Sequence, residues 1–232
     1  TLFFYQRFAV GLGLLGVFRL LGMNLIPQLW ATVGTLFTLA GGWLLLSGLW
    51  LEFHPGKKYS PGANDNASGA AVLLALAEYF KDQPPQGFQL GFGFLDGEET
   101  GLDGARALAR TLNPERVQVL NLDMVGAGDQ LRFVIKDGTL FPVKTDQKLN
   151  QLIQTVCPRA KPLHQTRRTG DYRPFLLAGI PAASLEISGS WAARTAYHTQ
   201  GDNLDLIETG ALQLAIETGI KLIKSLDQPS IG

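Results

Sequence analysis

The chain has 232 residues, which is enough for one globular domain with some additional sequence. It carries 20 Lys and Arg against 20 Asp and Glu, so no basic excess points to a nucleic-acid partner. A single cysteine, Cys157, excludes an intrachain disulfide. The chain has only three histidines, so each of them is considered as a possible metal ligand.

Residues 1–58 differ from the rest of the chain in composition. Residues 29–51 contain no charged side chain, and as a helix they would be roughly 35 Å long, enough to cross a bilayer with some tilt. Residues 8–26 are similarly apolar but include Arg19, whose charge is costly at the centre of a membrane. We interpret residues 1–58 as an apolar helical hairpin that is membrane-associated through residues 8–51. The alternative is a hairpin packed against protein.

The charges beside this hairpin bear on its orientation. If both helices cross the bilayer, Arg7 at one end lies on the same side as Lys57 and Lys58 at the other. Cytoplasmic flanks are enriched in Lys and Arg, so this bias favours a cytoplasmic position for the remaining domain.

Strand-like and helix-like runs alternate after residue 58. Hydrophobic periodicity and flanking Gly or Pro predict helices over 67–82, 101–112, 146–156, 171–180 and about 204–226. Short apolar runs predict strands over 88–95, 117–125, 131–135 and 182–187. This order predicts a layered α/β domain over residues 59–232, with a largely parallel sheet between helices. Ligand chemistry in such sheets gathers at the carboxyl ends of strands.

Two acidic segments follow this domain's first predicted elements. Asp65 stands between two asparagines just before a helix, a position that is also typical of an ordinary helix N-cap. Glu98 and Glu99 follow a predicted strand, where acidic charge also favours the next helix's N-terminus. The functional alternative splits this pair: one carboxylate binds a metal ion, and its neighbour removes a proton from activated water.

Two further candidates come later in the chain. Asp123 lies in an apolar strand, and a buried carboxylate is costly unless it is paired or bound to a metal. A salt bridge or backbone hydrogen bonds would satisfy it equally well. His198 lies in a loop before the last helix, where it is either a solvated side chain or a nitrogen ligand for zinc.

At these residues the sequence resembles the zinc aminopeptidases and carboxypeptidases of the M28 class. The matching segments are GANDNASG, GEETGLDGAR, NLDMVG, GDYRPFLLAGIPA and YHTQGDNLD, in the family's order and with similar spacing, over about residues 59–226. The resemblance implies a three-layer domain with a mixed, mostly parallel sheet, and two zinc ions bridged by one carboxylate.

Specific roles follow from the resemblance, residue by residue. It implies that Asp65 bridges the two metal ions, that Glu99 and His198 complete one zinc site, and that Asp123 belongs to the other. It implies that Glu98 is the general base. Tyr197 and Asp202 would support the site, whereas Asp171 would cap a short helix without a catalytic role. Independently of the resemblance, we interpret the basic side chains of Arg167, Arg168 and Arg173 as solvated surface; the alternative is a clamp for a substrate carboxylate.

The sequence departs from the family's pattern in one respect. The family has a His-x-Asp pair upstream of the bridging carboxylate, and this chain contains none. We expect that pair to lie upstream of Thr1, with the apolar hairpin as an insertion; His54 and, less plausibly, His164 are the alternatives as ligands. We therefore expect this chain to bind one zinc ion firmly and a second one poorly.

Three functions remain open at this stage. The first is a membrane-anchored zinc exopeptidase, an aminopeptidase acting on peptides with a free N-terminus. The second is a single-zinc acyltransferase resembling glutaminyl cyclases, which use an Asp, Glu and His ligand set. The third is a catalytically impaired, membrane-anchored homologue that uses its cleft for binding, although a carboxylate beside a metal site speaks against it.

Overall fold

The computed structural model describes residues 27–53, 59–138, 141–165 and 168–227. Contacts divide the chain into two compact units, Thr1–Lys57 and Lys58–Gly232. In the first unit, Pro27–Phe53 form one long helix, α2. No helix among the described residues has the length and hydropathy expected of a membrane span. The first arm of the predicted hairpin lies outside the described residues, so membrane association through residues 8–51 stays a prediction without support from the structure.

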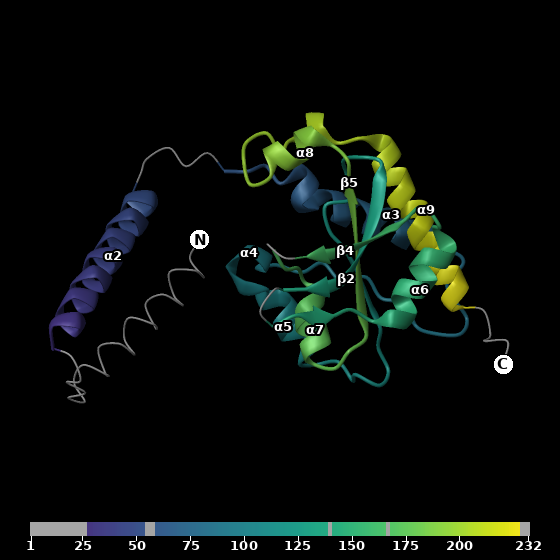
Figure 1. The fold of residues 1–232 in the computed structure, drawn as a ribbon. Coiled ribbons are helices and arrows are strands. Elements are labelled where there is room, and N and C mark those ends of the chain that lie inside the picture. The colour runs from purple at the N-terminus through teal and green to yellow at the C-terminus, as the bar shows by residue number, and fades with distance from the viewer. Residues whose placement is uncertain (1–26, 54–58, 139–140, 166–167, 228–232) are drawn as a thin grey trace. The chain divides into compact units, whose positions relative to one another are not determined.

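The second unit is built on a five-stranded mixed sheet (Figure 1). Its strands are β1 (Val119–Leu122), β2 (Gln130–Asp137), β3 (Val143–Lys144), β4 (Lys161–Gln165) and β5 (Ala182–Ser188). β1 pairs with β5 and β4 pairs with β2 in parallel, whereas β2 is antiparallel to both β5 and β3. The parallel ladders join more residue pairs than the antiparallel ones, which confirms the predicted mixed, mostly parallel α/β sheet.

Helices cover both faces of this sheet (Figure 1). α3 (Ser68–Lys81), α6 (Gln147–Val156) and α9 (Thr209–Leu226) pack on one face, where Val72, Ile153 and Ala215 are completely buried. α5 (Asp103–Ala109) and α7 (Tyr172–Leu177) pack on the other. Burial of each large aliphatic side chain stabilises the fold by about 1.5–3 kcal/mol. The two cores therefore fix the positions of the strands and helices, and with them the ends of the loops that connect the layers.

Short elements complete the unit and carry much of its chemistry. They are a π-helical turn η1 (Ala63–Ala67), the helices α4 (Glu98–Gly101) and α8 (Trp191–Ala196), and a 3₁₀ turn η2 (Leu204–Leu206). η1 and α4 are two of the acidic segments singled out in the sequence, and α8 leads from β5 towards His198.

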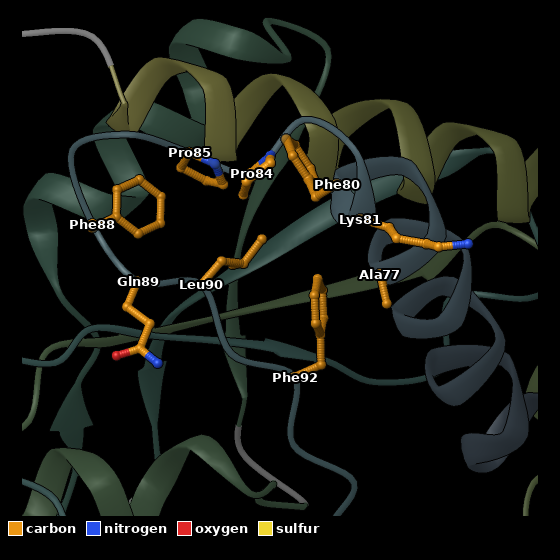
Figure 2. Close-up of a pocket in the computed structure, with 9 residues that line it drawn as sticks. All are labelled: Ala77, Phe80, Lys81, Pro84, Pro85, Phe88, Gln89, Leu90 and Phe92. Atoms are coloured by element: carbon orange, nitrogen blue, oxygen red, sulfur yellow. The ribbon is translucent and has the colours of Figure 1, made fainter.

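The predicted strand over 88–95 is wrong: these residues form no strand in the structure. Their exposure still alternates, with Phe88, Leu90 and Phe92 turned inward. These three side chains line a pocket of about 240 Å³ beside α3 (Figure 2), which includes none of the predicted site residues. Period-two alternation reveals an extended backbone, but a strand also requires a hydrogen-bonded neighbour, and the glycines at 91 and 93 weaken that pairing.

Other boundaries also shift for local reasons. The predicted helix over 101–112 is shorter in the structure: α4 ends at Gly101, Leu102 takes a left-handed conformation with φ 63°, and α5 covers only Asp103–Ala109. The strand predicted over 117–125 ends at Leu122, since Met124 is also left-handed, with φ 53°. The helix predicted from about residue 204 begins at Thr209, after η2. β3, β4 and α8 were not predicted, because their sequences are short and partly polar.

Candidate metal centre

Asp65, Glu99 and His198 converge from three separate segments of the chain. His198 Nε2 lies 2.7 Å from Glu99 Oε1 and 3.3 Å from Asp65 Oδ2. One ligand atom from each residue lies within 4.8 Å of the other two. One imidazole and two carboxylates are a donor set that zinc accepts, and three protein ligands leave a coordination position open. The residues present therefore fit a catalytic zinc ion.

The Asp65 turn is held by the carboxylate of Asp202, which is only 1% exposed. Asp202 Oδ1 accepts the backbone N–H of Asn64 at 2.6 Å, and Oδ2 accepts that of Asp65 at 3.0 Å. The backbone carbonyl of Asp202 also accepts the N–H of Ala63 at 3.1 Å. Because Asp202 stands four residues after His198, these bonds fasten two of the converging segments to each other.

Asn66 fastens the same turn to the end of β1. Its side-chain Nδ2 donates to the carbonyl of Leu122 at 2.8 Å, and its Oδ1 accepts the N–H groups of Gly69 and Met124. A Cβ on Gly69 would lie 2.5 Å from that Oδ1, so this close approach requires glycine. The polar residues around Asp65 therefore do more than cap a helix: they bind the turn to the strand that leads to Asp123.

Asn64 and Ser68 extend this connection one step further. Asn64 Oδ1 accepts the N–H of Gly126 at 2.9 Å, and Ser68 Oγ accepts the N–H of Val125 at 3.1 Å. Ser68 Oγ in turn donates to the carbonyl of Asn64 at 2.7 Å. Both side chains are buried, so backbone groups after β1 that would otherwise lack partners are satisfied by this one motif.

His198 lies in a left-handed conformation, with φ 57°, at the end of the segment that follows α8. Its ring stacks on Tyr197 with 3.8 Å between ring centroids. The guanidinium of Arg168 lies 5.6 Å from the centroid of the same Tyr197 ring. The imidazole is therefore supported from one side by an aromatic ring, while its Nε2 faces the two carboxylates.

The carboxylates of this centre have raised pKa values, because burial and neighbouring negative charges disfavour their ionised forms. Burial, with the negative charge of Glu99 adding to it, raises the pKa of Glu98 to about 8. Burial, with the charge of Asp65 adding to it, raises the pKa of Asp123 to about 7. Burial and Glu99 also raise the pKa of Asp65. Crowded carboxylates with raised pKa values are characteristic of sites built to meet a cation or to exchange a proton.

Only some of the predicted metal-ligating residues therefore lie together in the structure. Asp65, Glu99 and His198 form one group, but within the described chain Asp123 is outside every group of three or more candidate ligands. His164 Nε2 lies 3.1 Å from the carbonyl of Gly138 and is not in the group. His54 lies outside the described residues.

The interpretation of the arginines as solvated surface is wrong for the two that are described. Arg168 Nη2 lies 2.6 Å from Glu186 Oε2, and Arg173 Nη1 lies 3.1 Å from Asp137 Oδ2. Glu186 and Asp137 are both buried on the sheet, so each carboxylate needs its cation. Arg167 lies outside the described residues.

The prediction that Asp171 caps a short helix is right only for its position. It does stand at the N-cap position of α7, but its side chain makes no capping hydrogen bond. Its Oδ1 is a buried atom without a hydrogen-bond partner in the described part of the chain, and burial raises its pKa. Its charge contributes to the raised pKa values of Glu98 and Asp123, so it belongs to the same acidic cluster. In the sequence, only the position of Asp171 in the family-like GDYRPF segment indicated that it lies near the centre.

These pKa values predict that the metal-free protein loses stability as pH rises. The folded-state pKa values of Glu98 and Asp123 lie above their ordinary values of 4.5 and 3.8. Their stabilising contribution is therefore complete below about pH 4 and is lost as pH rises through 7 to 8. We expect the melting temperature of metal-free protein to fall by about 5 °C between pH 5.5 and 8.5.

Thermal melts of chelator-treated protein across that pH range measure this effect. Zinc should reverse most of the loss, and Glu98→Gln should flatten the pH dependence. A melting temperature that rises towards pH 8.5 in the metal-free protein would contradict the acidic cluster as described.

The fold and this centre together define a three-layer α/β domain with a candidate metal site. Residues 51–223 match Peptidase family M28, which is most of the chain. The chain therefore belongs to the M28 peptidase family.

Individual relatives agree with this assignment. Aminopeptidase YwaD of Bacillus subtilis (strain 168) is 30% identical over 174 residues, which cover 68% of this chain and 36% of the relative. The structure of BSAP, a zinc aminopeptidase from Bacillus subtilis, matches with a TM-score of 0.63 at 26% identity, over 75% of this chain and 44% of that one. Glutaminyl cyclase of Porphyromonas gingivalis shares the fold, with a TM-score of 0.53 at 21% identity, over 72% and 67%. The chain thus spans less than half the length of the two aminopeptidases.

Proposed function

We propose that this chain carries the catalytic centre of a zinc-dependent exopeptidase, an aminopeptidase that hydrolyses the peptide bond next to a free N-terminus. The observation that carries the proposal is the convergence of Asp65, Glu99 and His198, with a third carboxylate, Glu98, that is adjacent to Glu99 in sequence and interacts electrostatically with it. Family membership and the similarity to zinc aminopeptidases support the same class of reaction.

Each residue has a distinct task in this proposal. Asp65, Glu99 and His198 would hold one zinc ion, which would polarise the scissile carbonyl and lower the pKa of water. Glu98 is outside the ligand group, so its carboxylate is free to take a proton from the attacking water and to deliver it to the departing amine. Asp202 and Tyr197 act as positioning residues, the first through the Asp65 turn and the second through the His198 ring.

A glutaminyl-cyclase-like activity is the second candidate, and one observation favours it. The described residues contain a single group of three candidate ligands, Asp65, Glu99 and His198, and Asp123 is outside it. A one-metal centre of this composition is the ligand set expected of those acyltransferases. The shared fold at low identity adds nothing to the choice between the two reactions.

A direct assay separates the two candidates. Zinc-loaded protein is incubated with leucine p-nitroanilide and, separately, with a peptide that begins with glutamine. We expect release of p-nitroaniline, its loss after chelation and its return on addition of zinc, with His198→Ala inactive at every zinc concentration tested. Cyclisation of the glutamine peptide without hydrolysis of the leucyl amide would instead establish the acyltransferase, and neither reaction would favour the impaired homologue.

A further inference from the structure

Arginine side chains from two helices line one hollow on the face of the sheet that α5 and α7 cover. The hollow has a volume of about 250 Å³, and its lining includes Arg106 of α5, Arg110 at the end of α5, and Arg173 of α7. The two helices lie side by side and share the buried core of that face (Figure 1). The candidate metal ligands are not among the described residues that line the hollow, so it is a second site rather than part of the metal centre.

Arg173 is held in a fixed position at this hollow. Its Nη1 lies 3.1 Å from Asp137 Oδ2, and its Nη2 donates to the carbonyl of Phe141 at 3.4 Å. The Arg173 side chain is 24% exposed, and its charge is matched by the buried Asp137 carboxylate. A guanidinium has five N–H donors, so Arg173 can still donate to a ligand although its charge is already paired.

Arg106 and Arg110 differ from Arg173, because their charges have no partner. They are four residues apart and therefore lie on the same face of α5. Both are exposed, and neither forms an ion pair or a side-chain hydrogen bond with another residue that the structure describes. The polarity of a helix favours basic residues near its end, but it does not explain a third arginine from α7 at the same hollow. Two like charges so close together favour a ligand that is negatively charged.

Apolar side chains complete the hollow. Leu102 and Pro174 are buried and contribute to its lining. Leu177 also lines it but is 69% exposed, so this side chain is open to contact with a ligand. The volume is below the about 300–1,000 Å³ that is usual for drug-sized ligands, so the hollow suits a small anionic group with a short apolar portion.

The number of charges and donors decides between the common biological anions. A phosphate monoester carries close to two negative charges at neutral pH and has three acceptor oxygens. Guanidinium groups bind such oxygens in a bidentate manner. A carboxylate has one charge and two oxygens, which a single guanidinium satisfies. Two unpaired arginines at one hollow therefore match a phosphate group better than a carboxylate.

We propose that the hollow between α5 and α7 binds a small phosphate monoester, with Arg106 and Arg110 at the phosphate oxygens and Leu177 against the apolar part of the ester. This site does not depend on the function proposed for the metal centre, because the two share no residue.

NMR titration of the ¹⁵N-labelled 232-residue chain with phenyl phosphate, inorganic phosphate and succinate tests the proposal. We expect saturable shifts in α5 and α7 with phenyl phosphate, and binding about tenfold tighter than that of inorganic phosphate, because the ring covers apolar surface of Leu177. Succinate should bind about tenfold more weakly than phenyl phosphate or not at all. Arg106→Gln/Arg110→Gln should weaken the binding of phenyl phosphate by about tenfold or more, since charged hydrogen bonds are lost. Leu177→Ser should abolish the preference for the ester over inorganic phosphate.

Arg116→Gln is the matched control, because it removes an exposed arginine that is not among the described lining residues and should keep wild-type affinity. The exchanged arginines are exposed, so the variants should keep the fold. Wild-type affinity in Arg106→Gln/Arg110→Gln would overturn the proposal, as would an equal loss in Arg116→Gln, which would indicate general charge attraction.

Two further arms identify where the phosphate binds and from which source. Each titration is run with zinc and after chelation, and binding that requires zinc and survives Arg106→Gln/Arg110→Gln would assign the phosphate to the metal centre and overturn the proposal. Phosphatidylcholine vesicles that contain phosphatidic acid present the same phosphate monoester on a lipid surface. Binding to these vesicles without binding to phenyl phosphate would overturn the assignment of a small soluble ligand, and succinate binding as tight as that of phenyl phosphate would overturn the selection of phosphate.

Discussion

Glu98→Gln should lower kcat for leucine p-nitroanilide by a factor of about 10²–10⁴ while leaving the affinity for zinc nearly unchanged. The amide is close to the carboxylate in size, so the packing at the start of α4 is kept. It cannot accept a proton from water, so the proton-transfer step loses its base. Zinc binding persists because Glu98 is outside the group formed by Asp65, Glu99 and His198.

The electrostatics of Glu98 suit such a base. In the metal-free protein, burial and Glu99 raise its pKa to about 8, so it holds its proton more firmly than an exposed glutamate does. A bound cation would lower that pKa, which would leave Glu98 ionised near neutral pH. The acidic limb of the pH–rate profile should therefore lie below pH 8 in the zinc-loaded wild type.

Steady-state kinetics and calorimetric zinc titration of the same preparations decide this prediction. Glu78→Gln on α3 is the control, since its side chain is 77% exposed and it should keep wild-type kcat. If Glu98→Gln lost zinc as completely as His198→Ala, Glu98 would be a ligand and the assignment of the base would fail. If its kcat stayed within a factor of about two of the wild type, another residue would have to act as the base.

The meeting of Asp65, Glu99 and His198 is the part of the centre that the sequence could predict. Asp65, Glu99 and His198 lie in short motifs whose order along the chain is characteristic of the family. The alternation of strands and helices also predicts the layered α/β fold, because the hydrophobic period is set locally, by which side chains face the core. The structure then adds why the motif around Asp65 is rich in asparagine: Asn64 and Asn66 bind the end of β1.

Other features could not be predicted because they depend on distant partners. The extended residues 88–95 have the alternation of a strand, but the sequence does not say whether a neighbouring strand is available to pair with them. Arg168 resembles a solvated arginine until Glu186, which is 18 residues away in sequence, is placed 2.6 Å from it. Asp171 resembles a helix cap until its burial near Glu98 is known.

Asp202→Asn should weaken zinc binding by about tenfold to hundredfold, although Asp202 is not itself a ligand. Its two carboxylate oxygens each accept a backbone N–H, from Asn64 and from Asp65, and both bonds are at the turn that presents the Asp65 ligand. An asparagine side chain has one acceptor oxygen, and its NH₂ would face a second N–H donor. One of these N–H groups would therefore lose its partner, at a cost of about 1–3 kcal/mol.

Urea unfolding of metal-free protein and calorimetric zinc titration together separate the two consequences. Asp202→Asn should lower the free energy of unfolding by that amount and should also shift the zinc isotherm, because a turn that is no longer fixed holds Asp65 less firmly opposite His198. Asp205→Asn is the matched control, since Asp205 is exposed in the same segment and should change neither quantity. Wild-type zinc affinity in Asp202→Asn would mean that Asn66 and Ser68 alone position the turn, and Asp202 would then serve folding rather than the metal centre.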